Sequence, residues 1–223
     1  MGQAIGEMLT MAVAVAISPI PIIAVVLLLV GPGGKPKGVA YVIGSATSTA
    51  VVGGVLVAVG IGSGTSGDGG PSTGTSVLKL VLGVLLLVLA AKQWRGRPLA
   101  GERAVMPSWM GALDGFTPVK ALGAGVVLNV FNPKNLLFIV AGAAAVAGAG
   151  ASGSQEAITW AVFCVVATIG VATPVVIVFA TGDRSAELLD RLKTWMSRNS
   201  GVIMAVILLI IGVKLLGDAI SGL

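Results

Sequence analysis

Histidine is absent from this sequence of 223 residues, and cysteine occurs once, at Cys164. The absence of imidazole argues against a His-ligated nickel or cobalt site. A membrane thiol–disulfide carrier needs two exchanging cysteines, so the single thiol is best interpreted as a small packing residue. The sequence contains no Walker motif and no visible nucleophile–base pair. We therefore expect no metal site, no cofactor and no enzymatic activity.

Charge is also scarce. Charged residues make up 10% of the chain, whereas soluble domains carry about 25%. Hydrophobic residues reach 56%, and the mean hydropathy is +1.02. Most of the sequence consists of apolar runs of roughly 20 residues, which is the length that spans a bilayer. The first residues contain Glu7 and no basic residue, a pattern that argues against a cleaved signal peptide. The sequence predicts an all-α integral membrane protein.

Six transmembrane helices account for the apolar runs. To within a few residues, the predicted spans are 5–30, 39–61, 77–91, 119–148, 158–181 and 202–220. Lys and Arg gather in the first, third and fifth connections, and the second has none before Lys79 at its far edge. The positive-inside rule places the basic connections in the cytoplasm and both termini outside the cytoplasmic membrane. This topology explains the net charge of +5 without nucleic-acid binding, for which no basic patch is visible.

The longest polar connection, 97–118, is the predicted cytoplasmic seam between a first three-helix half, 1–96, and a second, 119–223. A further helix near 184–197 has an apolar face opposite its charges, which is typical of a helix lying on a leaflet surface. A short solvated loop helix is the alternative. The apolar face consists of Leu188, Leu189, Leu192, Trp195 and Met196.

An odd number of spans in each half makes the second half enter the membrane from the opposite side. The two halves then form an inverted repeat, an arrangement common in secondary transporters. The first helix of each half is interrupted, by "SPIP" at 18–21 and by "NVFNPKN" at 129–135. Matched interruptions of this kind point to a transport site. The pattern leaves open whether the second interruption is a kinked span or joins a re-entrant pair.

Proline has no N–H, so each break frees backbone carbonyls, among them those of Val15, Ile17 and Asn129. Lys134 costs about 2.5–3.5 kcal/mol or more to insert near a span's centre, and no acidic residue lies mid-span to pair with it. These features predict a site for an anionic group. The alternatives are simple proline kinks, interhelical asparagine contacts, a snorkelling lysine, or a lysine bonded to freed carbonyls. The predicted substrate-binding set is Ser18, Pro19, Pro21, Asn129, Asn132, Pro133, Lys134 and Asn135.

The sequence offers weaker candidates for the residues that couple transport to an ion and for a hinge. Glu7 and Asp114 are carboxylates near span ends, while sodium on freed carbonyls or a proton on Lys134 are alternative coupling ions. Thr173 and Pro174 form a third kink that serves as a hinge or completes the cavity. The 33 glycines and the alanine-rich stretches allow close helix contact, either in a homodimer or between the halves.

The stretches "SPIPIIAVVLLLVGPGGKPKGVAYVIGSATSTAVVG" and "LDGFTPVKALGAGVVLNVFNPKNLLFIVAGAAAVAG" resemble the LysE exporter superfamily, most of all its GAP (glycolipid-addressing protein) branch. The "NPKN" core, Asp114 and the proline-bearing first span carry the resemblance, which covers nearly the whole chain. It implies a six-span exporter. Ile20 stands where amino-acid exporters of the superfamily usually have glycine, which weakens the case for an amino-acid substrate.

We therefore predict an exporter that moves a small anionic solute or a glycolipid-like lipid by alternating access, in contact with membrane lipids. The alternative is a non-transporting scaffold of a lipid-export or envelope machine.

Overall fold

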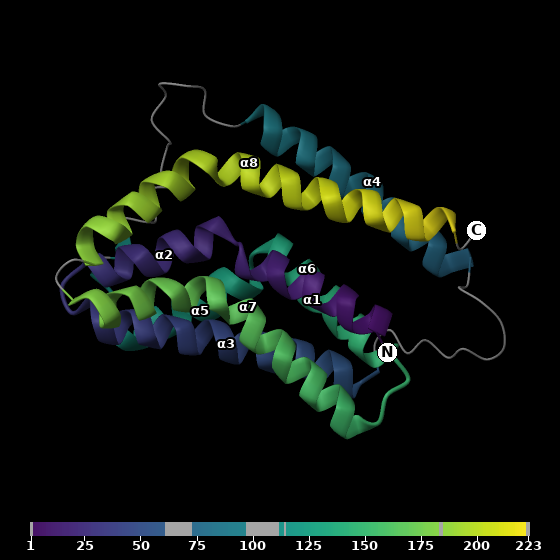
Figure 1. The fold of residues 1–223 in the computed structure, drawn as a ribbon, viewed down its shortest axis with the longest axis horizontal. Coiled ribbons are helices and arrows are strands. Elements are labelled where there is room, and N and C mark those ends of the chain that lie inside the picture. Colours follow the sequence, from purple (N-terminus) through teal and green to yellow (C-terminus); the bar gives the residue numbers. More distant parts are fainter. Residues whose placement is uncertain (1, 61–72, 97–111, 114, 183–184, 222–223) are drawn as a thin grey trace. The chain divides into compact units, whose positions relative to one another are not determined.

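The computed structural model describes residues 2–60, 73–96, 112–113, 115–182 and 185–221 (Figure 1). This part of the chain forms helices and no strand. The helices are α1 (Gly2–Ala16), α2 (Pro19–Val30), α3 (Gly34–Ala58), α4 (Thr73–Arg95), α5 (Pro118–Val130), α6 (Pro133–Ala147), α7 (Gly153–Thr181) and α8 (Ser185–Ile220). Most of the predicted seam, 97–118, lies outside the described residues.

The chain divides into two compact units. The first contains Met1–Gly64 and Met106–Thr194, and therefore α1 to α3, α5 to α7 and the beginning of α8. The second contains Thr65–Val105 and Trp195–Leu223, and therefore α4 and the remainder of α8.

Both predicted helix breaks are present, and they have the same local cause. Ser18 and Asn132 adopt extended backbone conformations as N-cap residues, and Pro19 and Pro133 are the first residues of the helices that follow. Proline is well suited to this position because its fixed φ is helical and its missing N–H is not needed there. The chain bends by 45° between α1 and α2, and by 71° between α5 and α6.

Helices α3, α7 and α8 are each long and apolar enough to cross a membrane. Counting each bent pair as one span gives up to five candidate spans among the described residues. The third predicted span, 77–91, lies within α4, and its membrane crossing stays a prediction. Residues 185–197 belong to α8, which continues without a break to Ile220, so the predicted surface helix and the last predicted span form one helix. The position of this segment on a leaflet also stays a prediction.

The first unit places the two broken helices against each other. α1 packs along α6 and α7, while α3 packs along α5 and α7 (Figure 1). Glycine permits these approaches. A Cβ atom on Gly125 of α5 would collide with the backbone carbonyl of Tyr41 on α3, and one on Gly170 of α7 would collide with that of Ala16 at the end of α1. Backbone approach of this kind is typical of packing between membrane helices.

The contact between α3 and α5 predicts different effects for two glycines of one helix. Gly125→Ala should destabilise the protein, because the new methyl group meets backbone of α3 that cannot move independently. Gly123→Ala is the matched control, since no atom lies within 4 Å of its Cβ position. The control should be neutral or stabilising by about 0.4–1 kcal/mol, because alanine restricts the unfolded chain. Thermal unfolding of both purified variants tests the close contact between Gly125 and α3. Equal melting temperatures of the two variants would contradict it.

Candidate functional site

The two helix breaks meet in space although they are far apart in the sequence. The side-chain amide of Asn132 donates a hydrogen bond to the hydroxyl of Ser18, with Nδ2 and Oγ 3.4 Å apart. The Nζ atom of Lys134 donates to the backbone carbonyl of Ala14 across 2.6 Å. The beginning of α6 is therefore joined to the end of α1. Pro19 and Pro21 are buried in the first turn of α2, and Pro133 begins α6.

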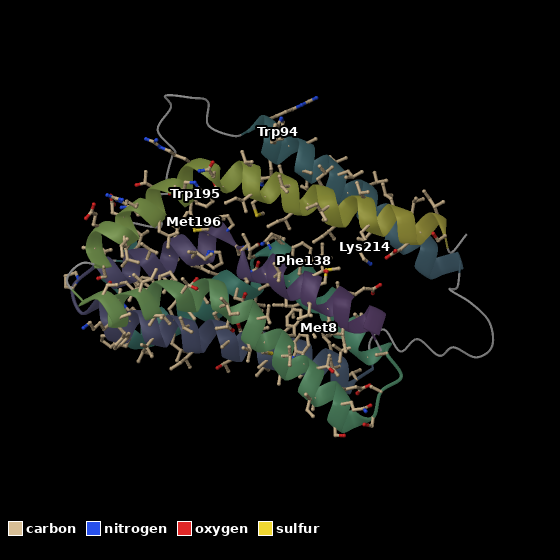
Figure 2. All side chains as sticks on the ribbon, in the orientation of Figure 1. Met8, Trp94, Phe138, Trp195, Met196 and Lys214 are labelled. Carbon is tan, nitrogen blue, oxygen red and sulfur yellow. The ribbon has the colours of Figure 1, made fainter. Side chains whose placement is uncertain are left out.

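The ammonium group of Lys134, a residue of α6, lies at the carboxyl end of α1. In a continuous helix the carbonyl of Ala14 would accept from the N–H of Ser18, but Ser18 is extended and starts α2. The last carbonyls of a helix are unpaired and carry the negative end of its dipole, so an ammonium group is favourable there. The lysine is 5% exposed, and its Nζ lies 5.6 Å from the centre of the Phe138 ring, which is labelled in Figure 2. The sequence allowed Lys134 to bond to a backbone carbonyl freed by the first break, and the structure shows a bond of this kind. The acceptor is the carbonyl of Ala14, whereas the sequence pointed to those of Val15 and Ile17.

No carboxylate forms an ion pair with Lys134 in the described part of the chain. The ammonium group has three N–H donors, and the bond to Ala14 uses one of them. A buried cation without an acidic partner is costly in a membrane-spanning segment. Its remaining donors and its charge are suited to an anionic group.

A second polar cluster surrounds Asn129 on α5. Its Nδ2 atom donates to the hydroxyls of Ser48 and Thr49 on α3, at 2.9 and 2.8 Å, and to the carbonyl of Ser45 at 3.2 Å. Both hydroxyls donate in turn to the Ser45 carbonyl, so their lone pairs face the amide. Asn135 of α6 donates to Oδ1 of Asn129 across 3.0 Å. The cluster thus joins α3, α5 and α6 inside the first unit.

The three α3 residues were not among the residues predicted for the site. A signal for them is present in "GSATST", where Ser45, Ser48 and Thr49 recur at a spacing that places them on one helix face. Buried hydroxyls on one face of a membrane helix are candidates for interhelical hydrogen bonds.

Two buried side-chain oxygens have no hydrogen-bond partner within the described residues, Oδ1 of Asn135 and the hydroxyl of Tyr41. An unpaired buried polar group costs about 1–3 kcal/mol, so such atoms call for a water molecule or a ligand group. Asn135 is the neighbour of Lys134 in the first turn of α6. This turn therefore presents an unpaired acceptor and a cation side by side in the sequence.

The candidates for coupling and hinge roles lie on α1 and α7, where the structure describes them. Glu7 lies on α1 about two turns, or roughly 10 Å, before Ala14. Asp114 lies outside the described residues. Thr173 donates to the carbonyl of Ile169, and α7 continues through the buried Pro174 without a break. The proposed coupling and hinge roles of these residues stay predictions.

Comparison with known proteins gives one result. A family model described as "Sap, sulfolipid-1-addressing protein" (SfLAP) matches residues 8–221, which is nearly the whole chain. No curated protein and no solved structure was found to match.

The Asn129 cluster predicts a strong coupling between two asparagines. Asn129→Leu should lower the free energy of unfolding by about 1–3 kcal/mol, because it leaves the buried amide of Asn135 without its acceptor. Adding Asn135→Leu removes that orphaned amide, so the double variant should regain part of the loss. Asn199→Leu is the control, since its amide makes one exposed bond to the Trp195 carbonyl. Unfolding of the wild type, of Asn129→Leu, of Asn135→Leu and of the double variant forms a double-mutant cycle, in which strictly additive losses would refute the coupling.

Proposed function

We propose that this protein, which belongs to the sulfolipid-1-addressing protein family, is an exporter that moves an anionic lipid across the cytoplasmic membrane by alternating access. In the proposed architecture six spans form two inverted three-helix repeats of the LysE type, with both termini outside. We propose transport and no enzymatic activity. A small anionic solute would use the same site chemistry.

The contact between the two broken helices carries the proposal. In transporters built from inverted repeats, the binding site lies where interrupted helices face each other near the middle of the membrane. Here Asn132 donates a hydrogen bond to Ser18, and Lys134 donates one to Ala14. Residues of the two breaks are therefore in direct contact. An ordinary proline kink would need no cation from the other half of the chain.

The chemistry of this contact favours an anionic head group. Lys134 has donors beyond the one used by Ala14, and Oδ1 of Asn135 can accept from a hydroxyl group. A lipid head that carries both a negative charge and hydroxyl groups would satisfy both residues. The family description, which names a sulfolipid, is in keeping with a lipid of this kind.

A scaffold for a lipid-export machine is the alternative within the same family, because addressing a lipid does not require moving it. Liposomes that contain only this protein distinguish the two. An exporter transfers a fluorescent anionic glycolipid between leaflets, detected as a change in the fraction that external dithionite quenches. A scaffold is inert in this assay and copurifies with partner proteins.

The same assay tests the role of Lys134. Lys134→Met should abolish transfer and also lower the free energy of unfolding by about 1–3 kcal/mol, because the Ala14 carbonyl loses its donor. Lys134→Arg should retain part of the activity at most, because a planar guanidinium does not reproduce a compact ammonium. Lys120→Met is the matched control, since this exposed lysine lies on the same broken helix pair.

Transport and melting temperature should be measured on the same preparations. A Lys134→Met protein that is destabilised but transfers lipid at the wild-type rate would show that the lysine is structural alone. An inactive wild-type protein in liposomes would favour the scaffold.

The proposed orientation predicts the labelling of two exposed positions. Ser154 lies at the beginning of α7, in a connection without Lys or Arg, whereas Ala186 lies near basic residues at the beginning of α8. In a Cys164→Ala background, a membrane-impermeant thiol reagent applied to intact cells should modify Ser154→Cys and spare Ala186→Cys. Both should react after the membrane is permeabilised. The reverse pattern in intact cells would invert the topology.

A further inference from the structure

The second unit is built around a close crossing of α4 and α8. Gly83 of α4 faces Gly212 of α8, and a Cβ atom on either glycine would lie within 3.2 Å of the other's carbonyl oxygen. The Leu87 side chain also lies against Gly212, and the Leu216 side chain lies against Gly83. Residues that follow Gly83 on α4 line a cleft together with residues that precede Gly212 on α8. The helices are therefore antiparallel and in contact through small residues.

Beyond this crossing, toward the end of α4, the two helices form an open apolar cleft of about 390 Å³. This volume lies within the range of about 300–1,000 Å³ that is usual for small-ligand sites. The small side chains of alanines on both helices create the cleft, and larger apolar side chains border it. The residues on which the argument depends are Leu87, Ala91, Trp94 and Arg95 of α4 and Ala205 and Leu209 of α8.

One end of the cleft carries the features of a membrane–water boundary. Arg95 is the last residue of α4, and Arg95 and Lys92 are the basic residues of its last turn. Trp94, at the same end in Figure 2, is 48% exposed. Tryptophan is enriched at membrane interfaces, and basic residues at the cytoplasmic surface attract anionic lipids. The guanidinium group of Arg95 is also suited to binding two phosphate oxygens at once.

We propose that this cleft binds an anionic phospholipid of the surrounding membrane, with one acyl chain against Leu87, Ala91 and Leu209 and the phosphate at Arg95. The apolar lining of the cleft is suited to the acyl chain. Arg95, the single cationic residue among those that line the cleft, is suited to the head group. The site depends on the second unit alone and on α4 crossing the membrane. It is independent of the transport site, and its ligand is a resident lipid, not the exported one.

The test compares two phospholipids on the full purified chain in detergent. Native mass spectrometry counts bound phosphatidylglycerol or phosphatidylcholine, and thermal unfolding reports the stabilisation that each lipid gives. The wild-type protein should retain phosphatidylglycerol in preference to phosphatidylcholine and melt at a higher temperature with it. Arg95→Gln should lose this preference. Lys92→Gln should keep it, because Lys92 shares the last turn but does not line the cleft.

A second variant tests the acyl-chain part of the site. Ala91→Leu fills the cleft from an exposed position and should reduce the bound phosphatidylglycerol, whereas Ala186→Leu, exposed and outside the cleft, should not. Equal retention of the two lipids by the wild type, or an undiminished preference in Arg95→Gln, would overturn the proposal. Loss of a dimer mass in Ala91→Leu with lipid binding intact would overturn it as well, and would assign the cleft to a second copy of the chain.

Discussion

Inside a bilayer no water is available to a backbone carbonyl, so an interrupted helix needs a hydrogen-bond donor from another part of the protein. This requirement governs the first unit. α1 ends at Ala16 because Ser18 turns the chain into a second helix that begins with proline. The donor for Ala14 comes from Lys134, at the beginning of the other interrupted helix. Asn132 and Lys134 of the second break thus both donate to the first break, within the contact between α1 and α6.

A lysine is a costly choice of donor. A neutral donor would satisfy the Ala14 carbonyl without the penalty of burying a charge. The protein uses neutral donors of this kind on the other side of the second break, where Asn129 donates to the hydroxyls of α3 and accepts from Asn135. The contrast between the two clusters is informative. A neutral network is sufficient to join helices, and the cation beside it adds a charge that no acidic residue in the described part of the chain balances. A negatively charged ligand is the simplest means of balancing it.

The breaks themselves could be predicted from the sequence, because the absence of an N–H in Pro19 and Pro133 is a local property. The acceptor of Lys134 could not, since it depends on the register of α1 against α6, two segments separated by more than a hundred residues. The hydroxyls of α3 were visible as a pattern, but Ser48 and Thr49 also bond within their own helix, so spacing does not reveal an external partner. The helix α8 contains Gly201, and this glycine makes its continuity difficult to predict from the sequence. Glycine suggests an end to a helix, yet within one it costs only about 1 kcal/mol.

The bond between Lys134 and Ala14 also constrains any alternating-access cycle. It joins the first half of the chain to the second, so a relative movement of the halves must lengthen or replace it. An anionic group can bind the two N–H donors of the ammonium that Ala14 does not use, and a bond between two ionised groups is stronger than one to a neutral oxygen. A ligand can shift a conformational equilibrium only by its difference in affinity for the two states. In the proposed exporter that difference would arise at Lys134, where the empty site has the Ala14 carbonyl alone and the occupied site has the ligand on the remaining donors as well.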